Sequence, residues 1–300
     1  MEDSIFLGLN GPLCLICAVV NVFFIFCLFC PRNGSKGVKQ PLKTLLLVTV
    51  VCTAILQIFF VQNMAMGSSS SYTTYHQILH IILKDLVEIS MTTTVWLNVF
   101  YFSQIVPAKR AFFVWLKANI KVFTYGALVF NWAFLISNGL LDIFLILELP
   151  QNASNITGNS TDTDTQVNEI FFLAIFVVEL LYLFLCLAVM MVSGCATVSY
   201  LWCHMKNVKT NKLSSSLKSQ ARVTITGIVQ TVLYSLCNAW IMAYMLKSVL
   251  LHSKFDRKSH IFYTIISLYS FGTSINLTIG QSLFRERAVE LWHKVSHSRR

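Results

Sequence analysis

The sequence has 300 residues, of which 55% are hydrophobic and 12% are charged, and its mean hydropathy is +0.65. Soluble globular domains carry about 25% charged residues, so this composition excludes a cytosolic globular enzyme. A helix that crosses a bilayer needs about 20 mostly apolar residues. The chain can therefore hold several such spans, with little left for a separate extracellular domain, and we expect an integral membrane protein.

Apolar runs of span length, separated by charged residues, prolines and Gly/Ser clusters, predict seven membrane-spanning helices. Pro31, Pro41, Pro107 and Pro150 fall at or beside predicted span ends, where a missing N–H costs least, and Pro12 lies inside a span. The third span is interrupted by charged residues near its start, but the topology requires it. The expected fold is all-α, with residues 1–300 forming a single seven-helix receptor-type domain whose spans are about 5–30, 44–66, 77–106, 122–147, 169–201, 223–248 and 261–284.

Basic residues gather in alternate loops of this arrangement. Of the 23 lysines and arginines, 18 lie in the loops after spans one, three and five and in the carboxyl-terminal tail. Cytoplasmic loops carry the positive excess, so we expect the amino terminus outside and the carboxyl terminus in the cytoplasm. Topology thus accounts for the net charge of +10, and no nucleic-acid partner is expected. The loop at 148–168 is then extracellular, and its three sequons predict glycosylation at Asn152, Asn155 and Asn159.

The residue sets that catalysis or metal binding requires are missing from the sequence. There is no His-Glu-x-x-His or Gly-x-Ser-x-Gly pattern, and the seven histidines are scattered, mostly at span boundaries or in loops. No inverted pair of Gly/Pro-broken helices is visible either, which counts against a secondary transporter. All nine cysteines fall in spans or at their cytoplasmic ends. We therefore expect no enzyme activity, no cofactor, no metal and no extracellular disulfide.

A specific resemblance begins at the cytoplasmic end of the third span. Val-Phe-Tyr-Phe-Ser-Gln-Ile at 99–105, followed by Phe-Val-Trp-Leu-Lys at 113–117, resembles the Val-Phe-Tyr-x-x-Lys-Ile and Phe-Leu-x-Leu-Lys motifs of the bitter taste receptors, the taste receptor type 2 family. Residues 274–285 are similar to the motif with which helix seven of the family ends. Asn21 and Phe24 match its Gly-Asn-x-Phe-Ile motif in helix one. The resemblance covers the whole chain and is strongest in helix three.

The chain departs from the family pattern at several positions. No basic residue lies between Lys43 and Lys84, so the family's helix-two Arg has no counterpart. Gln104 replaces the helix-three Lys, Thr273 replaces the helix-seven His, and Gln281 replaces the Asn that follows. The chain thus resembles a divergent member from a lineage outside the mammals. The alternatives are a vomeronasal type 1-like pheromone receptor and, in a different class, a small membrane carrier or channel.

The resemblance implies a G protein-coupled chemosensory receptor of the plasma membrane that binds small bitter or toxic molecules in the outer half of its bundle. Ionisable groups inside a bilayer usually face the bundle interior, which draws attention to the acids of spans three and five. Thr92 stands where the family has a ligand-contacting Trp. The candidate ligand-binding residues are Glu88, Thr92, Trp96, Glu179, Asn238, Tyr244, Tyr263 and Ser267.

Several of these residues have a plainer interpretation. Glu88 and Lys84 are four residues apart and could form an ion pair on one helix. The Thr92 hydroxyl could bond its own helix backbone, Trp96 could pack in the core, and Glu179 could be a protonated or water-solvated carboxyl. If the two acids and several aromatic rings face one cavity, however, the cavity suits a cationic or hydrogen-bonding amphipathic ligand.

The cytoplasmic side carries the second candidate site. By resemblance this surface engages a heterotrimeric G protein of the gustducin (inhibitory) class. Positive charge there also serves topology and attraction to anionic membrane lipid, so the prediction concerns the surface as a whole. Its candidate G-protein contacts are Tyr101, Gln104, Lys117, His204, Lys206 and Lys209.

Overall fold

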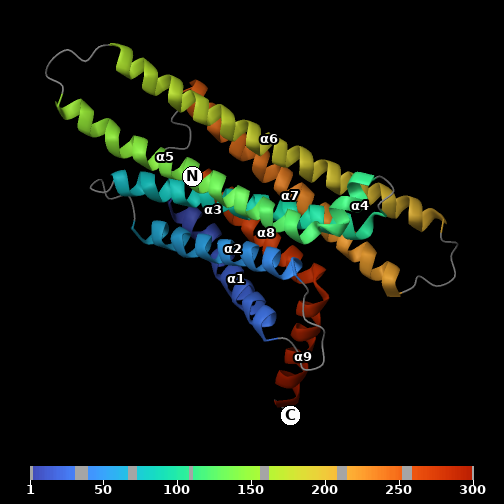
Figure 1. The fold of residues 1–300 in the computed structure, drawn as a ribbon. Coiled ribbons are helices and arrows are strands. Elements are labelled where there is room, and N and C mark those ends of the chain that lie inside the picture. Colours follow the sequence, from blue (N-terminus) through green and yellow to red (C-terminus); the bar gives the residue numbers. More distant parts are fainter. Residues whose placement is uncertain are drawn as a thin grey trace.

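A computed structural model of the chain describes residues 3–30, 40–66, 73–107, 111–155, 162–207, 215–251 and 259–298. These residues form helices and no strand (Figure 1). Seven helices lie at the seven predicted spans: α1 (Asp3–Phe29), α2 (Leu42–Met66), α3 (Thr73–Ile105), α5 (Ile120–Asn155), α6 (Asp162–Asn207), α7 (Ser215–Leu251) and α8 (His260–Gly280). Two further helices, α4 (Ala111–Ala118) and α9 (Ser282–Ser298), follow α3 and α8.

The helix ends differ from the predicted span ends at several places, most clearly around α5, α6 and α8. Helix α5 continues through Pro150 to Asn155, and α6 starts at Asp162, so helix covers most of the range 148–168 that was expected to be loop. The hydropathy pattern marks where apolar residues end, and a helix can continue beyond that point. The seventh predicted span runs to 284, whereas α8 ends at Gly280 because Gln281 adopts an extended conformation (φ −89°, ψ 120°) before α9 starts.

Helix α3 runs through the middle of the bundle (Figure 1) and packs against α2, α5, α6 and α7. Among the described residues, five helices have the length and hydropathy of membrane spans, and they are α1, α2, α5, α6 and α7. Helices α3 and α8 are 33 and 21 residues long. They bury many polar side chains, including Ser90, Thr93 and Asn98 on α3 and Ser270 and Ser274 on α8. A helix surrounded by other helices meets little lipid, so it tolerates this polarity.

The outer surface of the bundle is apolar. Leu15 on α1, Val122 on α5 and Val192 on α6 are 68%, 74% and 70% exposed. Exposed apolar surface this extensive marks an interaction with a membrane or another protein. Together with the span-length helices, it describes a helical membrane bundle.

Two large apolar clusters and a small one, formed by Cys52, Ile89 and Leu135, fill the interior of the described bundle. One large cluster joins the end of α2, the first half of α3, the end of α7 and the start of α8, and includes Phe60, Met91 and Tyr234. We call this half of the bundle the outer half, following the charge distribution. The other cluster joins α1, the start of α2 and the end of α8, and includes Leu45 and Phe284. Helix α9 turns away from the bundle after α8 (Figure 1), and Arg287 ties it to α1 by donating to the Cys30 carbonyl oxygen at 2.7 Å.

Candidate functional site

Five charged side chains gather between α3, α5 and α6 in the outer half. The Lys84 ammonium lies 2.5 Å from Glu179 Oε1 and 3.5 Å from Asp142 Oδ2. Asp85 and Glu88 lie within electrostatic range of the same groups. We call these five residues the acid–lysine cluster. Each helix contributes at least one charge, so the cluster joins three helices at one level of the bundle.

Lys84 connects helices rather than pairing along its own. Its ion pairs run to α5 and α6, so the possible pair with Glu88 one turn away is not the contact that the amine makes. Glu179 is 4% exposed, and its basic partner comes from another helix, which is why no such residue was visible within a turn of its own sequence. The side chains of Lys84 and Asp142 are 15% and 18% exposed, so the pairs are largely shielded from solvent.

Glu88 is the most enclosed member of the cluster. Its side chain has no exposed surface, and neither carboxylate oxygen accepts a hydrogen bond from the described residues. The charges that act on it come from Glu179, Lys84 and Asp85. A buried carboxylate without hydrogen bonds is costly, and such groups in membrane proteins usually serve a function.

A chain of hydrogen bonds lies beside the cluster and joins the same three helices. Asn131 on α5 donates to Thr92 Oγ1 at 2.6 Å and accepts from the Tyr182 hydroxyl of α6. The Thr92 hydroxyl also donates to the Glu88 carbonyl of its own helix at 2.7 Å. Thr92 therefore makes both the plain backbone bond and a contact between helices. The Tyr182 ring packs on Phe134 with ring centroids 4.6 Å apart.

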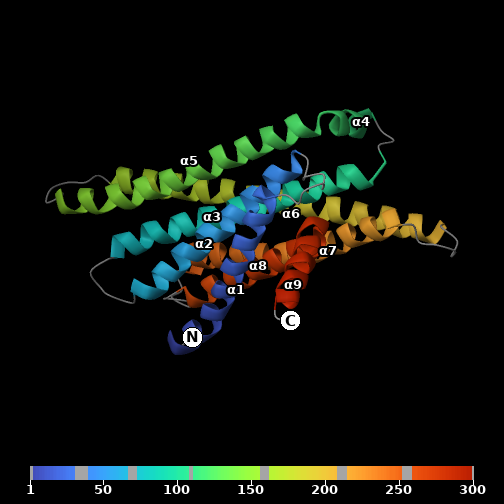
Figure 2. The same ribbon diagram turned by 90° about the horizontal axis from the view of Figure 1, so that it is seen from below.

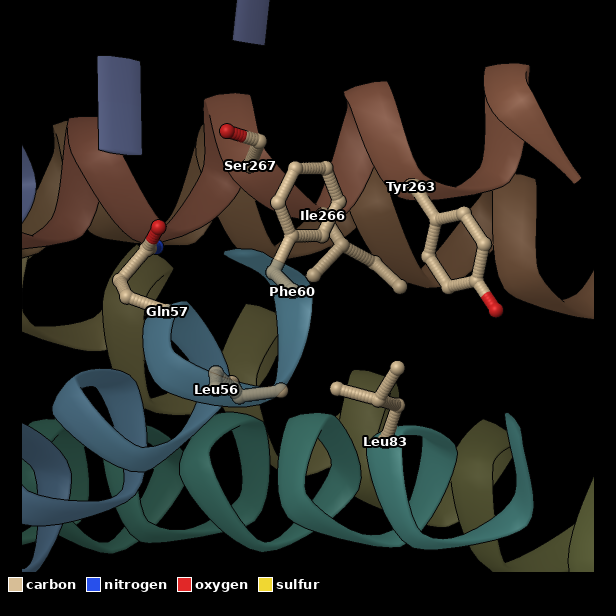
Figure 3. Close-up of a pocket in the computed structure, with 7 residues that line it drawn as sticks. All are labelled: Leu56, Gln57, Phe60, Leu83, Tyr263, Ile266 and Ser267. Carbon is tan, nitrogen blue, oxygen red and sulfur yellow. The ribbon is translucent and has the colours of Figure 1, made fainter. Parts of the chain in front are cut away.

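A small cavity lies between α2, α3 and α8 (Figure 3), away from the acids, which face α5 and α6. Its volume is about 10 Å³, which is room for about one water molecule. The predicted residues Tyr263 and Ser267 line it. Sequence reasoning missed the other lining residues, which are Leu56, Gln57, Phe60, Leu83 and Ile266. In this conformation the acids and the aromatic rings do not face one cavity.

Aromatic rings cover the end of this cavity. His80 stacks on Phe262 at 5.1 Å and lies 6.0 Å from Tyr263, centroid to centroid. Tyr244 packs on Phe262 at 4.8 Å, and its hydroxyl lies 3.2 Å from Ser259 Oγ. Tyr244 thus belongs to the aromatic cover rather than to the cavity wall.

Two predicted ligand residues lie elsewhere. Trp96 is partly buried in the second apolar cluster and meets the Phe123 ring edge-on at 5.6 Å, which is the packing role considered above. Asn238 is fully buried, its amide nitrogen lies 3.4 Å from Met242 Sδ, and its oxygen accepts no hydrogen bond from the described residues. Neither residue contacts the cavity.

The candidate G-protein residues lie at the opposite end of the bundle. Tyr101 is partly buried and accepts a hydrogen bond from Gln281, which joins α3 to the end of α8. His204 stacks on Tyr200 at 5.9 Å. The remaining described candidates are exposed on α3, α4 and α6, and they are Gln104, Lys117 and Lys206. Lys209 lies outside the described residues.

The three sequons are at the far end of α5 and beyond it. Asn152 and Asn155 lie in the last turns of α5, and Asn159 lies outside the described residues. Helices α5 and α6 extend past the ends of α2 and α3 there (Figures 1 and 2).

Polar side chains also bind α8 to its neighbours where the sequence departs from the family pattern. Ser274 donates to Asn21 of α1 at 3.0 Å, so Asn21 has an α8 contact in a chain that lacks the helix-two Arg. Gln230 of α7 donates to Thr273, at the family's His position, and accepts from Asn276, each at 3.0 Å.

The comparisons with known proteins identify the family. The family model described as Taste receptor protein (TAS2R) matches residues 3–296, which is nearly the whole chain. No curated protein matches the chain. Members of this family are receptors rather than enzymes, they cross the plasma membrane several times, and they act in bitter taste. The match selects a taste receptor over the pheromone receptor and the carrier or channel. With its helical membrane bundle and this match, the chain belongs to the TAS2R family of G protein-coupled taste receptors.

Proposed function

We propose that this receptor binds small bitter or toxic molecules in the outer half of its bundle and activates a heterotrimeric G protein of the gustducin (inhibitory) class at the other end. The observation that carries the proposal is the acid–lysine cluster, in which Glu88 and Glu179 are buried between three helices. Charge is expensive inside a membrane protein and is usually retained for function. The cavity beside Tyr263 and Ser267 lies on the α2 and α8 side of α3 and is a separate, apolar candidate for contact with the ligand.

The helix bundle must open before a ligand can bind in its outer half. Pockets for drug-sized molecules measure about 300–1,000 Å³, whereas the cavity holds about 10 Å³. A ligand therefore selects a conformation in which α3 separates from α2 and α8, or from α5 and α6. Helix α3 also carries Tyr101, about 20 Å along the helix axis from Glu88 at 1.5 Å per residue. A movement of α3 would reach the Tyr101–Gln281 contact at the cytoplasmic end and expose the G-protein surface.

The proposed topology has the amino terminus outside, with sugar on the loop after α5. The charge distribution and the sequons support it. Replacing Asn152, Asn155 and Asn159 by Gln, singly and together, would lower the apparent mass of the cell-expressed receptor stepwise, with glycosidase treatment as the control. If the triple variant has the mass of the parent protein, this loop is not glycosylated.

The function is tested by calcium mobilisation in cells that express the receptor with a chimeric G protein, using a panel of bitter compounds. A dose-dependent response that weakens or changes its agonist preference in Glu88→Gln and Glu179→Gln supports the proposal. Glu286→Gln is the matched control, because this exposed acid lies on α9. Surface delivery is measured with an antibody. Silence of a well-delivered receptor, or responses that both variants leave unchanged, would contradict the proposed site.

The G-protein class is tested separately. Purified receptor with an agonist should accelerate nucleotide exchange on a gustducin or inhibitory α subunit and not on a stimulatory one. Substitution of the exposed basic residues Lys117 and Lys206 together by Gln should slow this exchange without changing agonist affinity. Equal exchange on both α subunits would refute the class assignment.

A further inference from the structure

The acid–lysine cluster contains four carboxyl groups and one ammonium group. Lys84 makes ion pairs with Glu179 and Asp142, and Asp85 and Glu88 lie within electrostatic range of both the amine and Glu179. The cluster thus offers four carboxyl groups to one amine, and the amine lies closest to Glu179.

The surroundings of Glu88 indicate which kind of ligand the acid–lysine cluster binds. It is completely buried, neither of its oxygens accepts a hydrogen bond from the part of the chain that the structure describes, and the charged group that acts on it most strongly is another carboxyl, Glu179. The Thr92 hydroxyl, one turn along α3, donates to backbone oxygen instead. Glu88 therefore keeps its full capacity to accept a positive group.

A pair of aromatic rings lies in the neighbourhood of Glu88. Tyr182 is within electrostatic range of Glu88, and its ring packs on Phe134. Carboxylate groups beside aromatic faces are the usual surroundings for a positively charged nitrogen, which gains both charge pairing and cation–π attraction. A neutral ligand would use the rings but not the carboxyl groups.

Asp85 shows that the packing around the cluster is specific. A β-carbon on Gly139 of α5 would overlap the Asp85 carboxylate, so this carboxylate lies in the space that glycine leaves. Helix α5 thus approaches α3 closely enough to enclose the cluster. The enclosure keeps the carboxyls in a medium of low dielectric, where a cation is held strongly.

We infer that the acid–lysine cluster binds the positively charged nitrogen of an amine or quaternary ammonium ligand, and that Lys84 is a tethered cation which competes with it for Glu179 and Glu88. Lys84 can withdraw because its ammonium ends a flexible four-carbon stem near the end of the span. This inference rests on the proposed function and deepens it by naming the ligand class. It also makes Lys84 an internal inhibitor of ligand binding.

The experiment uses purified full-length receptor and measures its thermal stability with choline and with 3,3-dimethylbutan-1-ol, the uncharged carbon isostere of choline. A ligand that binds the folded state raises the unfolding temperature. Choline should stabilise the receptor and the isostere should not, at constant ionic strength. In Lys84→Met the concentration of choline that gives half the effect should fall about tenfold, because a buried competing charge is removed. Glu88→Gln should abolish the effect.

Three variants keep the result interpretable. Lys84→Arg retains the competing charge and should behave like the parent receptor, and Lys43→Met removes a lysine next to Phe29 at the other end of the bundle. If Lys84→Met is unstable without ligand, rescue by choline and not by the isostere is itself the expected result. Equal effects of choline and its isostere on Lys84→Met, or a choline effect that persists in Glu88→Gln, would overturn the inference. Failure of the proposed function would be seen in a different assay. In that case no agonist would activate the G protein, whatever choline does to the stability of the receptor.

Discussion

Replacing Asn131 by Ala should destabilise the receptor, because this side chain links three helices. Asn131 is 1% exposed, donates to Thr92 at 2.6 Å and accepts from Tyr182. A hydrogen bond contributes about 0.5–1.5 kcal/mol net in proteins, and about 0.6 kcal/mol on average between membrane helices. Two lost bonds, one of which leaves the Tyr182 hydroxyl without this acceptor, give a cost of about 2 kcal/mol. For a chain of this size that corresponds to a drop of about 4 °C in the unfolding temperature.

The assay is thermal unfolding of purified receptor in detergent, with Ser137→Ala as the matched control. Ser137 lies on the same helix, but it is exposed and bonds its own helix backbone. A double-mutant cycle with Tyr182→Phe adds a sharper test, because two residues that share a bond show non-additive effects. The reasoning is refuted if Asn131→Ala unfolds at the temperature of the Ser137→Ala control, or if the effects of Asn131→Ala and Tyr182→Phe simply add.

Three more predictions concern the contacts of α8 and the cavity. Gln281→Leu and Tyr101→Phe each break the same bond, so both should raise agonist-independent nucleotide exchange; opposite effects would mean that the bond does not restrain the receptor. Ser274→Ala removes the donor to Asn21 and should cost about 1 kcal/mol of unfolding free energy, which thermal unfolding measures; an unchanged midpoint would contradict the bond. Phe60→Ala should cost about 3–5 kcal/mol and enlarge the cavity, and benzene should restore part of the stability, whereas an equal benzene effect on the parent receptor would argue against a new cavity.

Apolar runs predicted seven spans because bilayer thickness sets span length, and a described helix overlaps each of them. Five of these helices have the length and hydropathy of membrane spans. The ends were less predictable. Pro150 does not end α5, and Gln281 ends α8 before Phe284, since these limits depend on local backbone geometry and not on hydropathy.

Contacts between helices were the hardest to predict. Spacing along one helix suggests a pair between Lys84 and Glu88, whereas packing brings Glu179 from α6 closer to the amine. Asp142 was overlooked, although an acid inside the fourth predicted span is the same signal that identified Glu179. Gln57 was recognisable on similar grounds, as an amide near the middle of an apolar span. Phe60 gave no such signal, because it resembles any lipid-facing ring until its neighbours are known.

The polarity of α3 affects how the receptor inserts into the membrane during its synthesis. A charged residue opposes entry of a span into the bilayer by up to about 3 kcal/mol at the middle of the span and by less towards its ends. Helix α3 carries three such residues, Lys84, Asp85 and Glu88, within two turns of its outer half. This helix gains its counter-charges from α5 and α6, which are synthesised later. During translation α3 must therefore wait beside the insertion machinery or enter with its neighbours. The same charges that we assign to ligand recognition would then limit how much receptor reaches the cell surface.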